Sequence, residues 1–329
     1  MVRDELQGIE REEDTMRKER IRAMIYGHAV GDALGVPVEF SSREQRKKDP
    51  VKAMWGEGTY NMPAGSWSDD TSMTLCLLES LNRLGRLDYD DIMKNFVRWM
   101  DGQEFTPTGV VFDVGNTSMA SIRRYTGGME PLVCGGRGIR DNGNGSLMRI
   151  APMVIFCEEH GGLTLNDEMV EKIHAVSALT HAHPRSQAAC VIFVATALRL
   201  LAGEPISQAI EQGVQETHRL YQDKPAHREE LLNAYHRLLN LSAFRRLPEE
   251  AIKSSGYVVD TLEAVSWCLL HSDSYRECVL RAVNLGEDTD TVAAIAGSLA
   301  GIIYDYEAIP SAWVQALKGR EQIENALGN

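Results

Sequence analysis

The sequence predicts an all-α protein that folds as one compact domain, and three observations lead to this prediction. Apolar residues recur at helical spacing along most of the chain, signals for β-strands are scarce, and no Pro- or Gly-rich linker divides the 329 residues. The composition, with 43% hydrophobic and 25% charged residues, is that of an ordinary globular protein able to bury a large core. We expect one domain over 17–325, after a charged N-terminal extension at 1–16.

The individual helices are predicted from apolar spacing. In the first helix, Ile21, Met24, Ile25 and His28 stand at positions i, i+3, i+4 and i+7 and share one face. In the second, Leu77, Leu78, Leu81 and Leu84 share one face through spacings of three, four and seven. Similar patterns predict helices at 88–100, 167–179, 184–202, 205–220, 227–243, 259–270, 274–284, 291–304 and 310–318. The run 142–145 (NGNG) is predicted to be a turn or loop, because no alternating apolar runs flank it as a hairpin would require.

The composition also excludes several classes of function. A net charge of −13 argues against general nucleic-acid binding, which needs a basic surface. No apolar stretch reaches the length of about 18 residues that a membrane helix needs, and the first twenty residues lack the apolar core of a secretory signal. The six cysteines include no CxxC pair, which indicates reduced thiols in apolar helices. We therefore expect a cytoplasmic protein without a membrane partner.

Two predicted helices carry small residues at every fourth position, in the sets Gly27, Gly31 and Gly35, and Ala293, Gly297 and Gly301. Residues at i and i+4 share a helix face, so each set predicts a groove without side chains. Glycine inside a soluble helix costs roughly 1 kcal/mol, so such a groove needs a reason. Close packing of two helices is the simpler reason, and close approach of a ligand is the alternative.

Two acidic clusters, 68–71 (SDDT) and 288–291 (DTDT), each precede an apolar helix. Either cluster could be a helix N-cap, because Ser, Thr and Asp accept hydrogen bonds from free backbone N–H groups there. An N-cap does not explain the second carboxylate beside the first. If the clusters meet in space, their four buried carboxylates repel one another, and two divalent cations would balance the charge. Oxygen ligands without Cys or His favour Mg²⁺ or Mn²⁺ over zinc.

Two further acids are candidates for the same site. Glu39 follows Pro37, so we expect it on a loop after the first helix, where catalytic groups are common. The alternative for Glu39 is an ordinary surface glutamate. Asp113 stands in the segment FDVGNTS, and its alternative is an Asx-turn before a helix at Thr117. Asp32 stands in the same segment as Glu39, GHAVGDALGVPVEF, but the sequence indicates no particular function for it.

Six segments, taken in order, resemble the ADP-ribosylglycohydrolase family: GHAVGDALGVPVEF, GSWSDDTSMTLCLLESL, FDVGNTS, GNGSLMRIAP, THAHPRS and AVNLGEDTDTVAAIAGSLAGIIY. The resemblance runs from about Ile21 to Tyr304, which is nearly the whole chain. A single element such as GNGS is weakly specific, whereas SDDT paired with DTDT is highly specific. The resemblance implies an orthogonal all-α helical bundle around two Mg²⁺ or Mn²⁺ ions.

The resemblance also implies roles for single residues. By position, the metal ligands would be Ser68, Asp69, Asp70, Asp288, Asp290 and Thr291. Glu39 matches a glutamate that some members use as the general acid/base, and Asp113 matches an acid near the metals. The residues that contact ADP-ribose would be Asn144, Gly145, Ser146, Met148, His181 and, beside the adenine, Tyr257. Two positions depart from the family pattern, since Ser68 replaces a common Thr and Glu287 replaces a usual Gly.

The reaction that this resemblance implies is hydrolysis of the C1″ glycosidic bond in an ADP-ribosylated protein or a small ADP-ribosyl conjugate. Its transition state would resemble an oxocarbenium ion, and Glu39 or Asp113 would handle the proton. Two alternatives stay open: an inactive family member that still binds ADP-ribose, and a two-metal hydrolase of another phosphoester or glycoside. The motifs do not choose between arginine, serine and acetyl-ester acceptors, or between Mg²⁺ and Mn²⁺.

Overall fold

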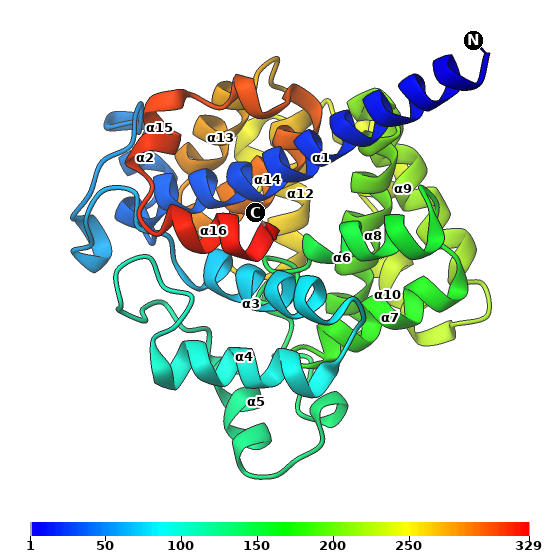
Figure 1. The fold of residues 1–329 in the computed structure, drawn as a ribbon. Coiled ribbons are helices and arrows are strands. Elements are labelled where there is room, and N and C mark those ends of the chain that lie inside the picture. Colours follow the sequence, from blue (N-terminus) through cyan, green and yellow to red (C-terminus); the bar gives the residue numbers. More distant parts are fainter. Residues whose placement is uncertain (1, 329) are drawn as a thin grey trace.

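The computed structural model describes residues 2–328, with side chains from Thr15 onward. In this range the chain forms sixteen α-helices, six short 3₁₀ helices and three isolated β-bridges, and no strand. The prediction of an all-α fold is therefore confirmed. Figure 1 shows α1 and α14 side by side through the centre, with α3 and α4 below them and α7–α10 at one flank. None of the helices in residues 2–328 has both the length and the apolarity needed to cross a bilayer.

The elements follow one another without a break between domains. The α-helices are α1 Val2–Gly35, α2 Arg43–Lys48, α3 Asp69–Leu84, α4 Tyr89–Gly102, α5 Asn116–Thr126, α6 Pro152–Gly161, α7 Asp167–Ala178, α8 Pro184–Leu201, α9 Ile206–Leu220, α10 Pro225–Ala234, α11 Leu241–Phe244, α12 Val258–Leu270, α13 Tyr275–Asn284, α14 Thr289–Tyr304, α15 Ser311–Ala316 and α16 Arg320–Leu327. The 3₁₀ helices are η1 Val36–Val38, η2 Gly58–Tyr60, η3 Pro131–Val133, η4 Leu238–Asn240, η5 Glu249–Ala251 and η6 Tyr306–Ala308.

Most predicted helices match the observed ones to within a few residues, and the differences have local causes. The helix predicted at 227–243 is wrong as a single element, because the chain divides into α10, η4 and α11 there. The break falls at Tyr235, which is fully buried and donates a hydrogen bond from its hydroxyl to the Arg185 carbonyl oxygen at 2.8 Å. The helices α2, α6 and α16 were not predicted. They are short, and α2 buries no residue, so apolar spacing gave no signal.

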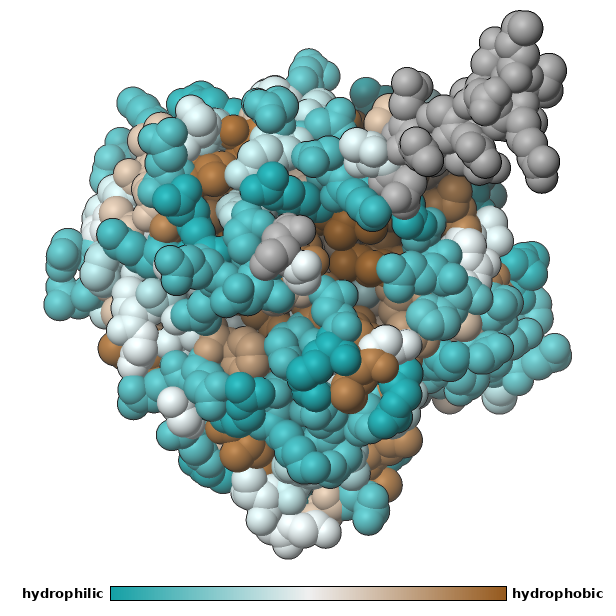
Figure 2. All heavy atoms as spheres, viewed as in Figure 1, coloured by the Kyte–Doolittle hydropathy of each residue, from teal (hydrophilic) through white to brown (hydrophobic). Residues whose placement is uncertain are grey.

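The core surrounds α14, in which every residue from Thr289 to Ile302 is buried. All six cysteines are free and buried, as expected for small apolar side chains. The face of the molecule in Figure 2 is mainly hydrophilic, with apolar residues scattered singly or in small groups. Such scattered apolar residues are normal on a folded protein surface.

Helices α1 and α14 touch through their backbones, which explains the two sets of small residues. A Cβ atom added to Gly31 would lie 2.1 Å from the Ala293 carbonyl oxygen, and one added to Gly297 would lie 2.2 Å from the Gly27 carbonyl oxygen. At the end of α1, a Cβ on Gly35 would lie 2.3 Å from the Asp290 Cα. The helix-packing interpretation is therefore confirmed, and the contact extends to the acidic end of α14.

We expect Gly31→Ala to destabilise the protein by about 1–3 kcal/mol or more, because the new methyl group would overlap backbone that no side-chain rotation can move. Thermal unfolding followed by circular dichroism would measure this as a lower Tm. The matched control is Gly102→Ala at the exposed end of α4, where the nearest atom to a new Cβ is the Glu104 Oε1 at 3.8 Å. Equal Tm values for the two variants would contradict the close packing.

Candidate functional site

The two acidic clusters meet at one place, although 221 positions separate the residues in contact. The Thr291 hydroxyl donates a hydrogen bond to the Asp70 Oδ2 at 3.2 Å, and the Ser68 hydroxyl donates to the same oxygen at 3.1 Å. Asp70 and Asp290 are both fully buried. The N-terminal ends of α3 and α14 therefore face each other, and the two clusters, whose spacing in sequence did not show that they meet, converge in the structure.

Asp32, on α1, fixes the start of α3. Its fully buried carboxylate accepts hydrogen bonds from the Ser68 backbone N–H at 2.8 Å, the Thr71 backbone N–H at 3.0 Å and the Thr71 hydroxyl at 2.6 Å. Burial raises the pKa of Asp32 to about 6, against the lowering effect of these bonds. The sequence did carry a signal for this role. Asp32 lies four residues after His28 on the predicted apolar face, where a carboxylate needs donors.

The N-cap alternative holds for one cluster only. The Ser68 hydroxyl accepts a hydrogen bond from the Asp70 backbone N–H, so Ser68 caps α3 while it also contacts the Asp70 carboxylate. Asp288 precedes α14 but makes no capping bond with its side chain. Instead, the Asn144 side-chain amide donates to the Asp288 Oδ2 at 2.8 Å. Asp290 accepts a hydrogen bond from the Thr291 backbone N–H through its Oδ1 at 2.9 Å, so helix capping accounts for that oxygen but not for the Asp288 carboxylate or the Asp290 Oδ2.

Three buried carboxylate oxygens at this place have no hydrogen-bond partner among the described side chains: Asp70 Oδ1, Asp288 Oδ1 and Asp290 Oδ2. Burial raises the pKa of Asp69, Asp70 and Asp290 well above the ordinary range, and the neighbouring carboxylates add to this effect. Unpartnered buried oxygens of this kind are costly unless a cation binds them. The donor set contains only oxygen, so the residues fit a hard divalent cation.

Glu39 lies at the end of η1 and is only 6% exposed, so the alternative of a surface glutamate is wrong. The Tyr60 hydroxyl donates a hydrogen bond to the Glu39 Oε2 at 2.6 Å. Glu39, Asp113 and Asp290 each place one carboxylate oxygen within 4.8 Å of the others. Burial, followed by repulsion from Asp113, raises the pKa of Glu39 to about 9. Without a bound cation, burial and the neighbouring acids therefore favour the protonated form of Glu39.

Asp113 has a φ of 53°, in the left-handed region that few residues other than glycine adopt. It makes no Asx-turn cap for α5, which begins at Asn116 and has Gly115 as its N-cap residue. The Gly115 backbone N–H instead donates to the Asp69 Oδ2 at 3.4 Å. Backbone strain of this kind concentrates at functional sites, where the surrounding structure holds it in place.

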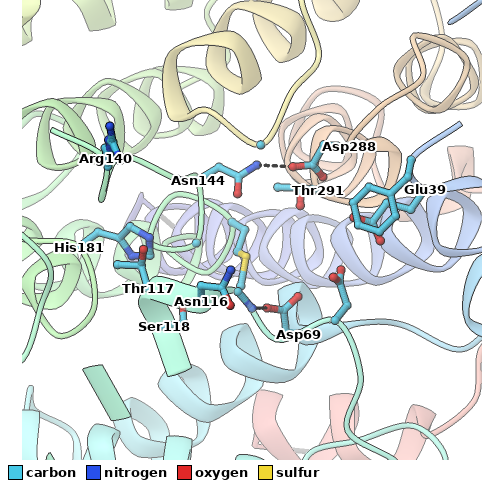
Figure 3. Close-up of a pocket in the computed structure, with 17 residues that line it drawn as sticks. Glu39, Asp69, Asn116, Thr117, Ser118, Arg140, Asn144, His181, Asp288 and Thr291 are labelled. Atoms are coloured by element: carbon cyan, nitrogen blue, oxygen red, sulfur yellow. Dashed lines mark hydrogen bonds between the residues drawn. The ribbon is translucent and has the colours of Figure 1, made fainter. Parts of the chain in front are cut away.

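These acids form one end of a pocket of about 340 Å³. Figure 3 shows Glu39, Asp288 and Thr291 on one side of this pocket, and Arg140 and His181 on the other. The remaining lining residues include Asp69, Asp113, Asn116, Thr117, Ser118, Gly143, Asn144, Gly145, Met148 and Gly256. The pocket is therefore acidic at one end, whereas the opposite end offers hydrogen-bond donors and one cation.

Four of the six predicted ADP-ribose contacts line this pocket: Asn144, Gly145, Met148 and His181. A Cβ on Gly145 would lie 2.9 Å from the His181 Cε1, so glycine keeps this wall open. Ser146 is not among the lining residues, since it is fully buried with its Oγ 2.9 Å from that of Ser177. Tyr257 is not among them either, and its hydroxyl accepts a hydrogen bond from Arg185 at 2.8 Å.

Sequence reasoning missed several residues of the pocket. Asn116 and Ser118 line the pocket and stand in the segment FDVGNTS, in which Asp113 is the only residue with an acidic side chain. Arg140 is exposed beside the NGNG loop, and a basic residue next to a glycine-rich loop could have indicated an anion site. Tyr60 gave no signal, because its contact with Glu39 depends on a loop that carries no recognisable motif.

Comparison with known proteins now identifies the family. The model of the ADP-ribosylglycohydrolase domain matches residues 13–329. This chain belongs to the ADP-ribosylglycohydrolase family. The chain is 32% identical to ADP-ribosylarginine hydrolase Tri1 of Serratia proteamaculans over 93% of this chain and 77% of that protein. It is 30% identical to the ADP-ribosyl-[dinitrogen reductase] glycohydrolase of Rhodospirillum rubrum over 91% of this chain and 90% of that protein.

A solved structure agrees with the sequence relatives. The fold of this ADP-ribosylglycohydrolase family member superposes on an ADP-ribosylglycohydrolase-related protein complex with a TM-score of 0.77 and 30% sequence identity. The match covers 95% of this chain and 97% of the other. The family resemblance noted in the sequence and the all-α architecture are thus both confirmed.

We expect the protein in EDTA to lose thermal stability as the pH rises from 6 to 8. The pKa of Glu39 rises from 4.5 to about 9 on folding. Between these values the folded chain holds a proton that the unfolded chain has lost, so the free energy of unfolding falls with increasing pH. Added Mg²⁺ or Mn²⁺ should raise the Tm, and more at pH 8 than at pH 6, which scanning fluorimetry would show.

Asp290→Asn tests whether the buried acids cause the expected dependence of the Tm on pH and metal. The variant removes one buried charge, so in EDTA at pH 8 it should be more stable than the wild-type chain, and added metal should stabilise it less. Asp223→Asn changes an exposed aspartate and should behave as the wild-type chain does. If the Tm of all three proteins responded equally to metal and pH, the acidic centre would not be the cause.

Proposed function

We propose that this protein is a binuclear Mg²⁺- or Mn²⁺-dependent hydrolase that releases ADP-ribose from arginine-linked ADP-ribosyl groups on a protein or small conjugate. The observation that carries the proposal is the convergence, in one pocket, of buried carboxylate oxygens without hydrogen-bond partners. The arginine acceptor is supported by relatives named ADP-ribosylarginine hydrolase, at 32% and 31% identity. The six thiols, all free, suit a cytoplasmic setting.

The two ends of the pocket match two parts of ADP-ribose, the anionic diphosphate and the distal ribose with its hydroxyl groups. Arg140, His181 and the backbone at Gly143 and Gly145 would face the diphosphate, because a cation and N–H donors stabilise an anion. The acidic end would receive the distal ribose. With the ribose in this position, the C1″ carbon would lie beside Glu39 and Asp113. Both carboxyl groups would then be within reach of the glycosidic bond for proton transfer.

The residues that would hold the two cations are Ser68, Asp69, Asp70, Asp288, Asp290 and Thr291. When bound, such ions supply positive charge that polarises substrate oxygens and orients the sugar. Asp32 would keep the first cluster in place through its bonds to Ser68 and Thr71. Asn144 would orient Asp288 in the same way.

Glu39 and Asp113 would share the proton transfers. The Tyr60 hydroxyl donates to the Glu39 Oε2, so the proton of neutral Glu39 belongs on its Oε1. Glu39 would give this proton to the leaving nitrogen as the bond between C1″ and that nitrogen breaks. Asp113 would take a proton from the water that attacks C1″. Two neighbouring carboxyl groups, one that donates a proton and one that accepts a proton, can serve as acid and base in this way.

Release of free ADP-ribose from arginine-linked and serine-linked substrates, followed by chromatography, tests this proposal. Each substrate is incubated with Mg²⁺, Mn²⁺ or EDTA. We expect metal-dependent release from the arginine linkage, and loss of it in Asp290→Asn. Calorimetry with ADP-ribose separates the alternatives, because binding without release would indicate an inactive binder. Release of ribose phosphates would indicate a phosphoesterase.

Glu39→Gln should lower kcat on the arginine-linked substrate by about 100- to 10,000-fold, because the amide cannot donate the proton. Metal-induced stabilisation should remain, since the six proposed ligands are unchanged, and a shift in Tm on adding Mg²⁺ would verify this. Glu287→Gln is the matched control, because Glu287 is exposed and does not line the pocket. A wild-type kcat in Glu39→Gln would assign the proton transfer to another group.

A further inference from the structure

A buried arginine outside the acidic centre is connected to the pocket through two hydrogen bonds. Arg149 is fully buried, its Nε and Nη1 have no hydrogen-bond partner, and it makes no ion pair in the described part of the chain. Its Nη2 donates to the Val176 carbonyl oxygen at 3.1 Å and to the Thr180 Oγ1 at 2.8 Å. The Thr180 Oγ1 lies 2.8 Å from the Nδ1 of His181, and His181 lines the pocket.

The chemistry of these three side chains determines the direction of each bond. A guanidinium group can only donate, so the Thr180 oxygen accepts from Arg149. Burial lowers the pKa of Arg149 only to about 10, so the group remains a donor at neutral pH. Within residues 15–328 the Thr180 hydroxyl has no other acceptor than the Nδ1 of His181. The buried hydroxyl can use both its lone pair and its proton only if it donates to Nδ1, and Nδ1 is then unprotonated.

The second ring nitrogen of His181 then carries the proton, and it lies near Gly143 and Gly145, which line the pocket with His181. A Cβ on Gly143 would lie 3.6 Å from the His181 Nε2, and one on Gly145 would lie 3.5 Å from it. Figure 3 shows the His181 ring beside Thr117 at the end of the pocket opposite Glu39. Burial, with the charge of Arg149 adding to it, lowers the pKa of His181 to about 3, so the ring stays neutral.

The backbone around His181 is held as firmly as its ring. The His181 carbonyl oxygen accepts a hydrogen bond from the Ser177 hydroxyl at 2.8 Å, and the His181 backbone N–H donates to the Ser177 carbonyl oxygen at 2.8 Å. Ser146 lies against the same Ser177 hydroxyl. Ser146 therefore supports His181 from the core, which gives a role to a predicted contact residue that does not line the pocket.

We infer that Thr180, held by Arg149, is a positioning residue that fixes His181 as the neutral tautomer with its proton on Nε2. His181 then offers one N–H donor to an oxygen of the ADP-ribosyl group, while an imidazole of the other tautomer would present a lone pair and repel that oxygen. The part of this inference that concerns the ligand rests on the proposed function. The tautomer itself is a property of the chain without ligand.

Nitrogen-15 NMR of the ligand-free protein, labelled at histidine, tests the tautomer directly. His181→Gln identifies the signals by their loss. We expect a protonated Nε2 and an unprotonated Nδ1 for His181 in the wild-type protein and in Thr180→Ser. Thr180→Val has the same shape but no hydroxyl, so it should lose this fixed pattern. A protonated Nδ1 in the wild-type protein would overturn the inference, whatever the protein binds.

Calorimetry with ADP-ribose measures the consequence for binding. We expect Thr180→Val to raise the Kd by about tenfold, the equivalent of one hydrogen bond, and Thr180→Ser to restore it. Thr217→Val is the matched control, because Thr217 is equally buried but bonds only the Gly213 carbonyl oxygen on α9. A wild-type Kd in Thr180→Val would overturn the inference. If the wild-type chain bound no ADP-ribose, the proposed function would fail while the NMR result still decided the tautomer.

Discussion

The backbone contact between α1 and α14 is the constraint on which the site depends. Gly35 at the end of α1 leaves no room for a side chain against Asp290 at the start of α14. The same helix end leads directly into η1 and Glu39. A larger residue at this crossing would separate the helices, and the acids at the start of α14 would then move away from those at the start of α3. The glycines have no side chain that could take part in a reaction, but they hold α1 and α14 close enough for the acids to meet.

Burial of so many acids is the second physical feature, and it links stability with function. Asp32, Asp69, Asp70 and Asp290 are buried on helices that also form the core, so their ionisation is costly unless donors or a cation compensate the charge. Asp32 is satisfied by backbone and hydroxyl donors from α3, whereas Asp70 and Asp290 each keep an oxygen without a partner. This difference separates a structural carboxylate from those that are available to a cation.

The two ends of the pocket differ in their chemistry: one carries carboxyl groups and the other a neutral histidine. Burial, followed by repulsion from Asp113, raises the pKa of Glu39 at the acidic end and so favours a proton donor there beside other carboxylates. At the other end, the same low-dielectric surroundings keep His181 neutral, and the bond from Thr180 decides which nitrogen can donate. Both ends are therefore set by side chains that do not themselves line the pocket, such as Tyr60, Thr180 and Arg149.

The sequence by itself determined most of the longer helices, the small-residue faces and the acid pairs at the starts of α3 and α14, because these depend on spacing within one segment. Only the tertiary structure brought Thr291 against Asp70, turned Ser146 into the core and placed Arg140 at the pocket. Periodicity shows that a helix has a buried face, but it does not show which other face meets it. Contacts between distant segments are decided by packing of the whole core, and the site consists of such contacts.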